Sequence, residues 1–574
     1  MLKRITFSFI AVLLVVSLSF AGKVEQHKAQ KAGADQVATT VLPAKSMSKV
    51  SANVLGFTDY DYAGNGTVNE MVWPYDIDGD GVLDPVGTYM ERFIDNPTRA
   101  NVMFLGLEGE FTNLPASDPA LLTGWGTIQS IDEGPWAGHA AIAGHQGGAG
   151  VWTVYNLADF STVYFHGVSN VAQNFPTFAY LADGTIPMQF TDGNFYTTTA
   201  ADPLTITAQG QAVDPAASEN PVRRSPNGEY LAVVADDGAQ YVYLYTSNDA
   251  GATWVQEQIG EQEVSPIVNR PGYLPLFVNF GQRNYAVDNN GVVHVGYNGY
   301  SLQISGTDTS AAFPALYWNS RDKEWIAISD ESEELGNELA DLRQGNGIGN
   351  SYPHPSISPD GMVVSMFYQA PEFDGGVLQT YPGDGSANTF ECFQTDLKHA
   401  HSADGGKTFT TPVKVDSELG RSEKFPSAYD FLTNDGNDYT VRFVFFVDDV
   451  PGVSLFSYNS GSDGGYWNYS EFTFTAEPVS VNDEVLANSF SLQQNYPNPF
   501  NPSTTIKYSV PQLSDVSIKV YDVLGKEVAT LVDAQQAQGV YEVNFDAANL
   551  ASGMYIYTIQ AGSFTSSKKM LLMK

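Results

Sequence analysis

The sequence predicts an all-β protein with two folded parts, and three observations carry this prediction. The chain of 574 residues contains 53 Gly, 30 Pro and 13% aromatic residues, a composition typical of loop-rich β folds. A strand-and-turn unit at residues 220–254 recurs in imperfect copies through the middle of the chain. Residues 490–574 differ from everything before them in charge and in pattern, which indicates a separate domain.

The unit at residues 220–254 shows the repeated pattern most clearly. Ser225-Pro-Asn-Gly228 is a turn signal, and residues 229–234 then alternate and run apolar as a half-buried strand does. Asp-Asp-Gly at 236–238 predicts the next turn, and residues 240–246 predict a second strand. Three or four short antiparallel strands joined by tight turns form one blade of a β-propeller.

Further blades are expected wherever this combination of proline, small residue, turn and strand recurs. The six anchors are Pro135-Trp136-Ala137, Phe175-Pro176-Thr177, Pro221, Asn284-Tyr285-Ala286, Pro353-His354-Pro355 and Phe425-Pro426-Ser427. We therefore predict a six-bladed propeller over residues 51–480. Residues 72–125 could form a further blade or the strand that closes the ring, so seven blades are the alternative.

Two octapeptides share a spacing of polar and small residues that suits a tight turn between strands. They are Ser247-Asn-Asp249-Ala-Gly251-Ala-Thr253-Trp254 and Ser402-Ala-Asp404-Gly-Gly406-Lys-Thr408-Phe409. The Ser and Asp side chains can accept hydrogen bonds from the turn, and the glycine can adopt positive φ. Both resemble the Asp box, or BNR repeat, of sialidase-like propellers, and a weaker copy stands at Ser460–Trp467. In that family these boxes are structural elements at the blade periphery.

The charge and the cysteine content exclude some function classes. With 28 Lys+Arg against 65 Asp+Glu the net charge is −37, which disfavours nucleic acid as a partner because phosphate binding requires clustered cations. The acidity favours an extracellular surface, with or without bound cations. One cysteine, Cys392, cannot form a disulfide within the chain.

An acidic loop at residues 76–87 is the one candidate metal site. Asp76, Asp78, Asp80 and Asp84 occupy positions 1, 3, 5 and 9 of a calcium loop, with Gly81 at position 6. Position 12 is Gly87 where a bidentate Glu is expected, and the flanking prolines disfavour the helices of an EF-hand. The loop therefore resembles calcium loops of dockerin and thrombospondin type 3 repeats. A solvated acidic turn is the alternative.

The N-terminal segment predicts export. Lys3 and Arg4 precede an apolar run that ends in Ser19-Phe20-Ala21, so residues 1–21 are typical of a secretory signal peptide. Residues 22–50 have no sustained period and predict a flexible lead-in. No later stretch is apolar for 18 residues, so we expect no transmembrane segment in the mature chain. Residues 481–489 predict a linker.

The C-terminal part predicts a small Ig-like β-sandwich. Residues 503–510, 516–521, 541–545 and 554–559 alternate at period two between Gly and Pro turns. Asn495-Tyr-Pro-Asn-Pro-Phe-Asn-Pro502, Tyr521-Asp-Val-Leu-Gly525 and the Lys568–Lys574 ending resemble the type A C-terminal sorting domain of the type IX secretion system. The resemblance implies that residues 490–574 engage the type IX secretion machinery. It also implies removal of the tail and then release or attachment to surface lipopolysaccharide. An Ig-like stalk without a sorting role is the alternative.

No catalytic residues can be assigned. The resemblance to sialidases implies three arginines, a Tyr–Glu pair and an Asp, but the Arg-Ile-Pro motif of that family is absent. The histidine pairs His139/His145 and His399/His401 lack a third ligand at a metal-site spacing and are interpreted as ordinary polar residues. The sequence therefore favours a non-catalytic protein without excluding an enzyme.

Aromatic residues in predicted loops suggest a binding face, although core positions between blades are the alternative for each. They are Trp125, Trp136, Tyr297, Tyr300, Tyr317, Trp318 and Tyr368. We expect a secreted or surface-bound propeller that recognises an extracellular glycan or protein. A sialidase-like glycoside hydrolase or lyase and a structural component of an extracellular layer are the alternatives. Buried arginines or paired carboxylates at the mouth of the channel would favour the enzyme.

Overall fold

The structure is a computed structural model, and the chain divides into two compact units, Met1–Pro478 and Val479–Lys574. The described residues are 53–58, 70–93, 96–213, 220–236, 241–261, 266–276, 283–305, 308–331, 350–371, 379–382, 389–392, 394–415, 422–448, 465–477, 491–492, 495, 498, 500–510, 513–523, 525–536, 539–562 and 564–573. The predicted signal peptide, lead-in and linker lie outside them, as do the side chains of Trp125, Tyr300 and Cys392. No helix in the described part of the chain is long and apolar enough to cross a bilayer.

The first unit consists of antiparallel sheets, which confirms the all-β prediction. Sheet 1 contains β2 (Val86–Phe93), β3 (Asn96–Leu107) and β4 (Glu110–Pro115), and residues 72–75 add an inner segment through bridges to Gly87 and Asp84. Sheet 2 contains β5 (Thr123–Ile131), β6 (His139–Gln146), β7 (Ala149–Asn156) and β8 (Thr162–Val168). Sheet 3 contains β9 (Thr177–Phe178), β10 (Thr185–Gln189), β11 (Asn194–Thr199) and β12 (Asp202–Ala212).

Sheets 4 to 6 repeat this arrangement with insertions. Sheet 4 contains β13 (Arg223–Arg224), β14 (Leu231–Asp236), β15 (Tyr241–Ser247) and β16 (Val255–Glu261). Sheet 5 contains β18 (Arg283–Val287), β19 (Val293–Asn298), β22 (Ala315–Asn319) and β23 (Ile326–Ala327). Sheet 6 contains β24 (Ser351–Ile357), β25 (Val364–Pro371), β28 (Thr395–Ser402) and β29 (Val413–Lys414).

Sheet 7 joins strands from both ends of the first unit. It contains β30 (Ser422–Ala428), β32 (Asp438–Asp448), β33 (Gly465–Thr475) and β1 (Asn53–Thr58), with β31 (Thr433–Asp435) beside β32. β1 pairs antiparallel with β33 at the edge of this sheet and also contacts β2 of sheet 1. Sheet 7 therefore connects the end of the unit to its beginning.

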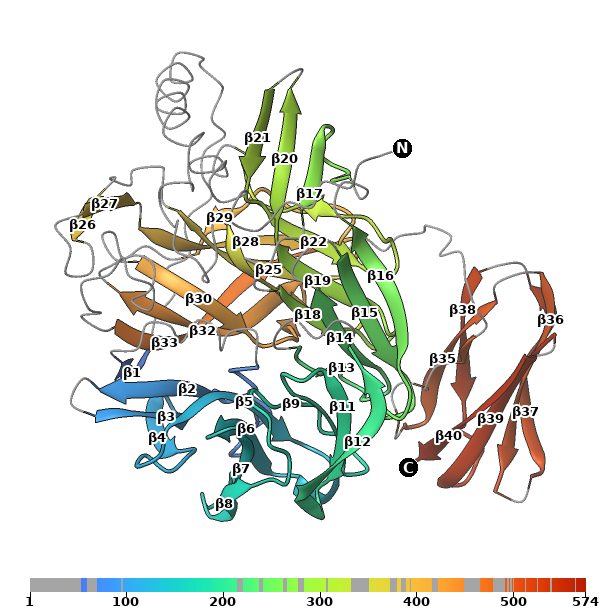
Figure 1. The fold of residues 1–574 in the computed structure, drawn as a ribbon. Coiled ribbons are helices and arrows are strands. Elements are labelled where there is room, and N and C mark those ends of the chain that lie inside the picture. The colour runs from blue at the N-terminus through green and yellow to red at the C-terminus, as the bar shows by residue number, and fades with distance from the viewer. Residues whose placement is uncertain are drawn as a thin grey trace. The chain divides into compact units, whose positions relative to one another are not determined.

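The sheets follow one another around a ring (Figure 1). The inner strands of successive sheets contact each other from sheet 4 to sheet 7, and β2 contacts β5 in the same way. Sheets 3 and 4 meet through the Thr177 hydroxyl, which donates to the Asn220 carbonyl at 3.2 Å. The interfaces are filled by clusters of buried apolar side chains, such as Trp152, Phe178 and Met188 between sheets 2 and 3. This arrangement is consistent with a propeller.

Turns at one edge of the ring are hydrogen-bonded to one another. The Asn227 N–H donates to the Asn289 Oδ1 at 2.9 Å, and the Asn289 N–H donates to the Pro359 carbonyl at 2.8 Å. These three residues belong to the turns between the first and second strands of sheets 4, 5 and 6. The connections therefore add polar links to the apolar contacts between sheets.

One expectation about the repeats requires correction, and one open alternative is decided. Pro135-Trp136-Ala137 was expected to begin a blade, but Gly134–Trp136 form a 3-10 turn after the inner strand β5. For residues 72–125 two alternatives were open, and the structure agrees with the further sheet, because these residues form most of sheet 1 and β1 is the strand that pairs with the last sheet. In sheet 1 the acidic loop 76–84 takes the place of the short Asn-Gly type of turn. The repeat pattern of the sequence was therefore misleading for this sheet.

Two hairpins are inserted between the second and third strands of their sheets. β20 (Tyr300–Ser305) and β21 (Asp308–Ala312) interrupt sheet 5 and form a separate sheet with β17 (Tyr273–Leu276), which pairs with β20. β26 (Gln379–Pro382) and β27 (Thr389–Cys392) interrupt sheet 6 and pair with each other. Figure 1 shows both extending beyond the sheets that carry them. In a ring of this kind the inner strands of all sheets run in the same direction along the central axis. Connections between second and third strands therefore leave the ring at the same edge, and both insertions emerge there.

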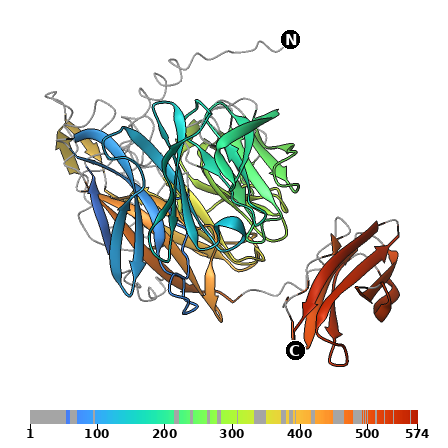
Figure 2. The ribbon, with the colours of Figure 1, turned by 90° about the horizontal axis from the view of Figure 1, so that it is seen from below.

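The second unit is a sandwich of two antiparallel sheets (Figure 2). One sheet contains β34 (Ser491–Leu492), β35 (Ser503–Val510) and β38 (Gly539–Asp546), and the other β37 (Glu527–Gln536), β36 (Ser514–Asp522), β39 (Gly553–Ala561) and β40 (Phe564–Leu572). Alternate side chains such as Ile506, Ile518 and Tyr557 fill its core. The period-two pattern in the sequence arises from this half-buried packing.

Candidate functional site

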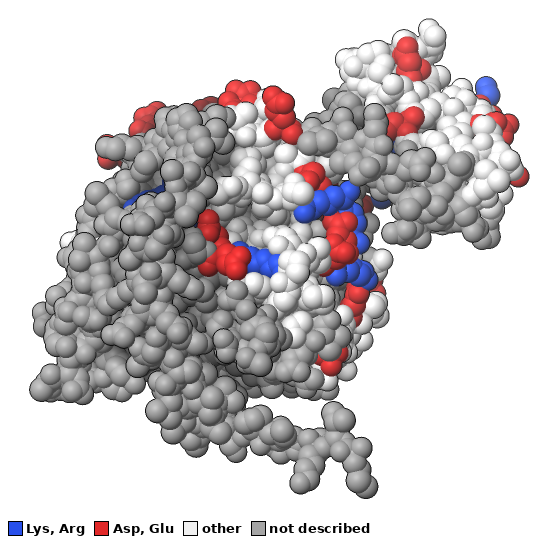
Figure 3. All heavy atoms as spheres, turned by 90° about the horizontal axis from the view of Figure 1, so that it is seen from above, with Lys and Arg blue, Asp and Glu red and all other residues white. Residues whose placement is uncertain are grey.

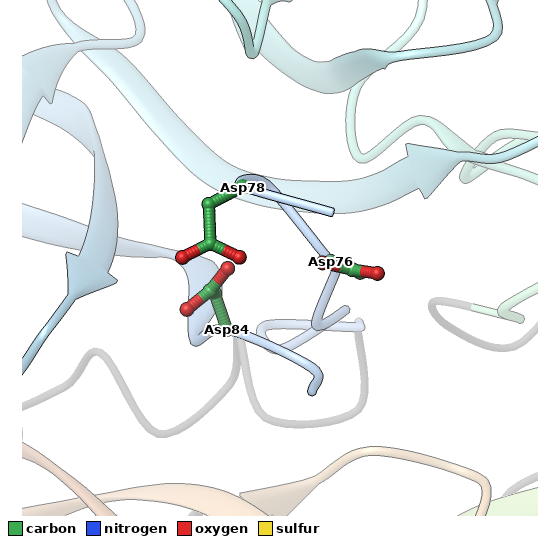
Figure 4. A group of neighbouring side chains, drawn as sticks. All are labelled: Asp76, Asp78 and Asp84. Carbon is green, nitrogen blue, oxygen red and sulfur yellow. The ribbon is translucent and has the colours of Figure 1, made fainter. Parts of the chain in front are cut away.

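The acidic loop gathers three carboxylates at the start of sheet 1 (Figure 4). Asp76, Asp78 and Asp84 each present an oxygen atom, and these atoms lie within 4.8 Å of one another. Asp80 is not part of this group, and its Oδ1 accepts a hydrogen bond from the Val82 N–H at 2.7 Å. The bridge between Tyr75 and Asp84 closes the loop, so residues at both of its ends converge.

Backbone N–H groups of the loop hold these carboxylates in place. Asp76 accepts from Gly79 at 2.8 Å and from Gly81 at 3.0 Å, and both glycines have positive φ. Asp84 accepts from the Ile77 N–H at 2.9 Å. The donor set consists of oxygen atoms alone, which suits a hard divalent cation such as calcium.

The electrostatics of the loop also fit a cation. Burial raises the pKa of the Asp84 carboxyl, the charges of Asp78, Asp80 and Asp76 raise it further, and the hydrogen bond from Ile77 opposes the rise. A raised pKa means that the folded loop holds an ionised Asp84 at a cost. A divalent cation between the carboxylates would remove this repulsion.

The two octapeptide turns adopt the same hydrogen-bonding pattern. The Gly251 and Gly406 N–H groups donate to the hydroxyls of Ser247 and Ser402, at 3.0 and 2.8 Å. In each turn the Thr hydroxyl donates to the Asp carboxylate at 2.6 Å, from Thr253 to Asp249 and from Thr408 to Asp404. Gly251 and Gly406 have φ of 80° and 90°, which glycine tolerates better than other residues.

Each turn ends on an aromatic residue that packs against a neighbouring sheet. The Trp254 ring is stacked on Phe195 of sheet 3, with ring centroids 4.2 Å apart, and Phe409 packs against Tyr317 of sheet 5. Both turns lie between the third and fourth strands of their sheets. The weaker copy is different, because Trp467 is a buried residue within β33, and residues 460–464 lie outside the described part.

A polar cluster that the sequence did not reveal lies where the inner strands meet. Six sheets contribute to it through Glu70, Gln129, Arg223, Tyr285, His354 and Asp430. Glu70, Arg223 and Asp430 are between 1% and 2% exposed, and His354 is fully buried. Sheet 3 contributes the Phe178 carbonyl, which accepts from Gln129 at 3.2 Å. All seven sheets therefore contribute a group to one connected cluster.

Arg223 connects the two acidic residues of this cluster. Its Nη1 lies 2.7 Å from Glu70 Oε1 and its Nε lies 3.6 Å from Asp430 Oδ2. The guanidinium also lies over the Tyr285 ring, 5.9 Å from the centroid. Gln129 donates to the second oxygen of Glu70 at 2.7 Å. The carboxylates are therefore compensated from several sheets at once.

The surroundings of His354 favour its neutral form. Burial lowers its pKa, Arg223 lowers it further, and Asp430 acts in the opposite direction. The Ala428 N–H donates to Nδ1 at 3.4 Å, so the ring proton lies on Nε2 and is donated to Asp430 at 3.2 Å. Asp430 thus accepts from the imidazole and faces the guanidinium, and its charge is balanced without a second cation.

The other candidate residues have structural positions. The side chains of Trp136, Tyr297, Tyr317, Trp318 and Tyr368 are at most 5% exposed, so the expectation that they form a binding face is wrong and their alternative as core residues holds. His399 and His401 stack at 5.6 Å among phenylalanines, and no carboxylate or cysteine joins them in a metal cluster among the described residues. Short-range spacing could not distinguish a loop aromatic from one between sheets.

Comparisons with known proteins identify the second unit. Residues 494–573 match the family model described as the secretion system C-terminal sorting domain. This unit is a sorting domain of the type IX secretion system, and the protein is secreted to the cell surface or the extracellular space. None of the curated proteins matches the chain.

Solved structures show distant similarity to the chain. A chain from a study of two prolyl endopeptidases is 10% identical with a TM-score of 0.35, over 79% of this chain and 57% of that chain. YCF48 bound to D1 peptide is 12% identical with a TM-score of 0.35, over 77% and 99%. Trypanosoma rangeli sialidase with the inhibitor DANA is 9% identical with a TM-score of 0.32, over 88% and 84%. Similarities this low carry no argument about activity or ligand.

Replacing Arg223 by Met tests the cluster. Two buried carboxylates would lose their cation, so we expect the free energy of unfolding to fall by about 3–5 kcal/mol at pH 7. Tryptophan fluorescence during denaturation reports on the first unit alone, because residues 479–574 contain no tryptophan. The control Lys407→Met removes an exposed charge and should change stability by less than about 0.5 kcal/mol. A loss below about 1 kcal/mol for Arg223→Met would show that the ion pairs do not hold the sheets together.

Replacing Gly406 by Ala tests the octapeptide turn. The new Cβ would lie 2.1 Å from the Tyr317 Oη and the residue would keep positive φ, so we expect a loss of about 3 kcal/mol or more. Gly147 also has positive φ but open space around its Cβ position. The matched Gly147→Ala should therefore cost about 1–2 kcal/mol. Equal losses in urea unfolding of the two variants would contradict tight packing at Gly406.

Proposed function

We propose that the first unit is a seven-bladed β-propeller, the alternative to six blades. Seven sheets follow one another in chain order, and β1 closes the last of them against the first. The polar cluster supports the same count, because each sheet contributes one group to it. Closure by β1 covers an edge that would otherwise be free to pair with other chains.

We further propose that this propeller recognises an extracellular glycan or protein. The observation that carries the proposal is the pair of inserted hairpins, β20–β21 and β26–β27, at the same edge of the ring. Insertions on a rigid scaffold are where binding residues commonly lie. The centre of the ring is filled by ion-paired side chains, so a ligand would contact the rim in preference to the axis.

A sialidase-like glycoside hydrolase is the second candidate, and one observation favours it. Glu70 and Asp430 form a carboxylate pair beside a buried arginine, the kind of constellation that glycosidases use. In this structure both are buried and ion-paired, which leaves little room for a substrate. A structural role in an extracellular layer is a third possibility without a specific observation in its favour.

The charge distribution is compatible with a protein that works outside the cell. Figure 3 shows acidic side chains in several patches on this face of the molecule, with basic ones close to some of them. The net charge of −37 maintains solubility and disfavours nucleic acid. We propose that residues 1–21 direct the first export step and that the sorting domain engages the type IX machinery for the second.

We propose calcium as the ligand of Asp76, Asp78 and Asp84. The converging oxygen atoms and the raised pKa of Asp84 support this proposal. The cation would stabilise the connection between the first two strands of sheet 1. Its role would be structural, since the loop lies apart from the inserted hairpins in the chain.

Ligand recognition can be tested with the full mature chain. Sialylated, host-type and plant glycans and extracellular proteins are incubated with it, and retained ligands and products are identified by mass spectrometry. We expect a ligand to be retained at unchanged mass. Released sugars that disappear in Glu70→Gln and Asp430→Asn while the unfolding midpoint of each variant is retained would establish the hydrolase instead, and retention of nothing would leave the structural role.

A second variant tests where the ligand binds. Residues 379–392, which include β26 and β27, are replaced by a Gly-Ser linker of equal length. We expect binding to weaken at least about tenfold, which corresponds to about 1.4 kcal/mol. The unfolding midpoint by tryptophan fluorescence should stay unchanged, because this hairpin is an insertion. Unchanged affinity would show that this hairpin does not carry recognition.

The calcium proposal predicts opposite effects with and without the ion. The Asp84 carboxyl has a higher pKa in the folded chain than in the unfolded chain. Its protonation therefore stabilises the folded state at pH values below the unfolded pKa, and this stabilisation is lost as the pH rises through the folded pKa. At pH 7 in chelator, Asp84→Asn should therefore be as stable as the natural chain or more so. At a calcium concentration about 100 times the Kd, binding should stabilise the natural chain by about 2.7 kcal/mol.

The matched control for this prediction is Asp80→Asn. Asp80 belongs to the same loop but not to the converging group, so this variant should keep most of the calcium effect. Asp84→Asn should lose it. The measurement is thermal unfolding followed by tryptophan fluorescence with and without calcium. An equal calcium effect in both variants, or none in the natural chain, would contradict the site.

A further inference from the structure

A groove lies between sheets 4 and 5, away from the polar cluster and the acidic loop. It is formed by β16, the outer strand of sheet 4, together with Trp318 and Lys323 of sheet 5. The volume of the groove is about 230 Å³. One water needs roughly 10–15 Å³ of such space, so the groove is far larger than a packing defect.

The strand that lines the groove contains a β-bulge. Val242 of β15 pairs with Gly260, but the adjacent Tyr243 pairs with Gln258, so Ile259 is an extra residue. A regular strand points successive side chains to opposite faces, and a bulge interrupts this alternation. It explains how Gln258 and Glu261, which are three positions apart, can lie on one side of the strand and line the same groove.

The floor of the groove is rigid. Trp318 and Trp325 are 1% and 2% exposed, with ring centroids 6.2 Å apart. The Trp325 indole N–H donates to the Ile259 carbonyl at 3.0 Å, which fastens the bulge of sheet 4 to sheet 5. The polar side chains therefore stand on a fixed apolar base, an arrangement suited to ordered ligand contacts.

Lys323 is held in a backbone conformation that disfavours it. Its φ is 59°, and it is the fourth residue after the end of β22. Gly251 and Gly406 occupy the same position after the third strands of sheets 4 and 6, with positive φ as well. Sheet 5 thus has a lysine where its neighbours have glycine, and the ammonium group pairs with Glu257 across the groove. Strain of this kind is found where a side chain is needed.

We propose that this groove binds a neutral pyranose unit of a glycan. Glu257 and Glu261 supply acceptors for sugar hydroxyls, and Lys323 and the Gln258 amide supply donors. In the structure Lys323 pairs with Glu257 and Gln258 donates to Glu261 at 3.3 Å, so a sugar hydroxyl would bridge or replace these contacts. Two carboxylates against one ammonium make the lining net negative, which disfavours sialic acids and other anionic sugars. This inference rests on the proposed recognition function, assigns it a ligand class, and adds a place of binding separate from the inserted hairpins.

The test uses saturation-transfer NMR on the full mature chain with methyl glucoside, galactoside, mannoside and N-acetylglucosaminide, and with sialyllactose. We expect signal transfer to at least one neutral hexoside. Lys323→Gly removes the ammonium and relieves the positive φ, so it should retain the melting temperature and lose signal at least about fivefold. Glu261→Gln should also reduce the signal. Lys407→Ala, which removes an exposed lysine from the corresponding turn of sheet 6, should not.

Several outcomes would overturn the inference. Equal transfer in the natural chain and Lys323→Gly, or transfer from sialyllactose alone, would place the sugar elsewhere and leave the recognition function standing. If no sugar shows transfer but the chain retains an extracellular protein, the groove inference would also fail while the recognition function stands. Absence of both would contradict the groove and the recognition function together.

Discussion

The buried pair of carboxylates around Arg223 is the constraint on which the first unit depends. Apolar contacts join each sheet only to its two neighbours. A ring with one sheet more or fewer would keep such contacts at every interface, so they do not determine the number of sheets. Arg223, Glu70 and Asp430 belong to sheets 4, 1 and 7, which are distant in sequence. Their charges are compensated when all the inner strands are in place, so the cluster couples closure of the ring to the number of sheets.

Polar links elsewhere repeat this principle at lower strength. The turns of sheets 4, 5 and 6 are joined by backbone and amide hydrogen bonds, and each octapeptide turn places an aromatic ring on the adjacent sheet. A ring assembled from such links can carry insertions without losing its geometry. The hairpins in sheets 5 and 6 and the bulge in sheet 4 are examples, and they supply the binding surfaces proposed for the protein.

Sequence reasoning identified local features well and long-range ones poorly. Alternation and Gly-Pro turns predict individual strands, and the motifs of residues 490–574 predict the sorting domain, because each depends on neighbours in sequence. The convergence of Asp76, Asp78 and Asp84 follows from loop spacing, whereas the exclusion of Asp80 depends on where the loop closes. Glu70 and Asp430 are separated by most of the propeller, and Lys323 becomes unusual when its φ is known. Neither has a local signature.

The pairing of β1 with β33 brings the beginning and the end of the first unit together in one sheet. Sheet 7 needs a strand from the beginning of the unit and four from its end, β31 included. During synthesis this sheet remains incomplete until β33 has emerged, by which time the six preceding sheets exist as polypeptide. Contacts of such long sequence separation are the slowest to form. The sorting domain follows directly in the chain, so the element that directs export is made after every strand of its cargo.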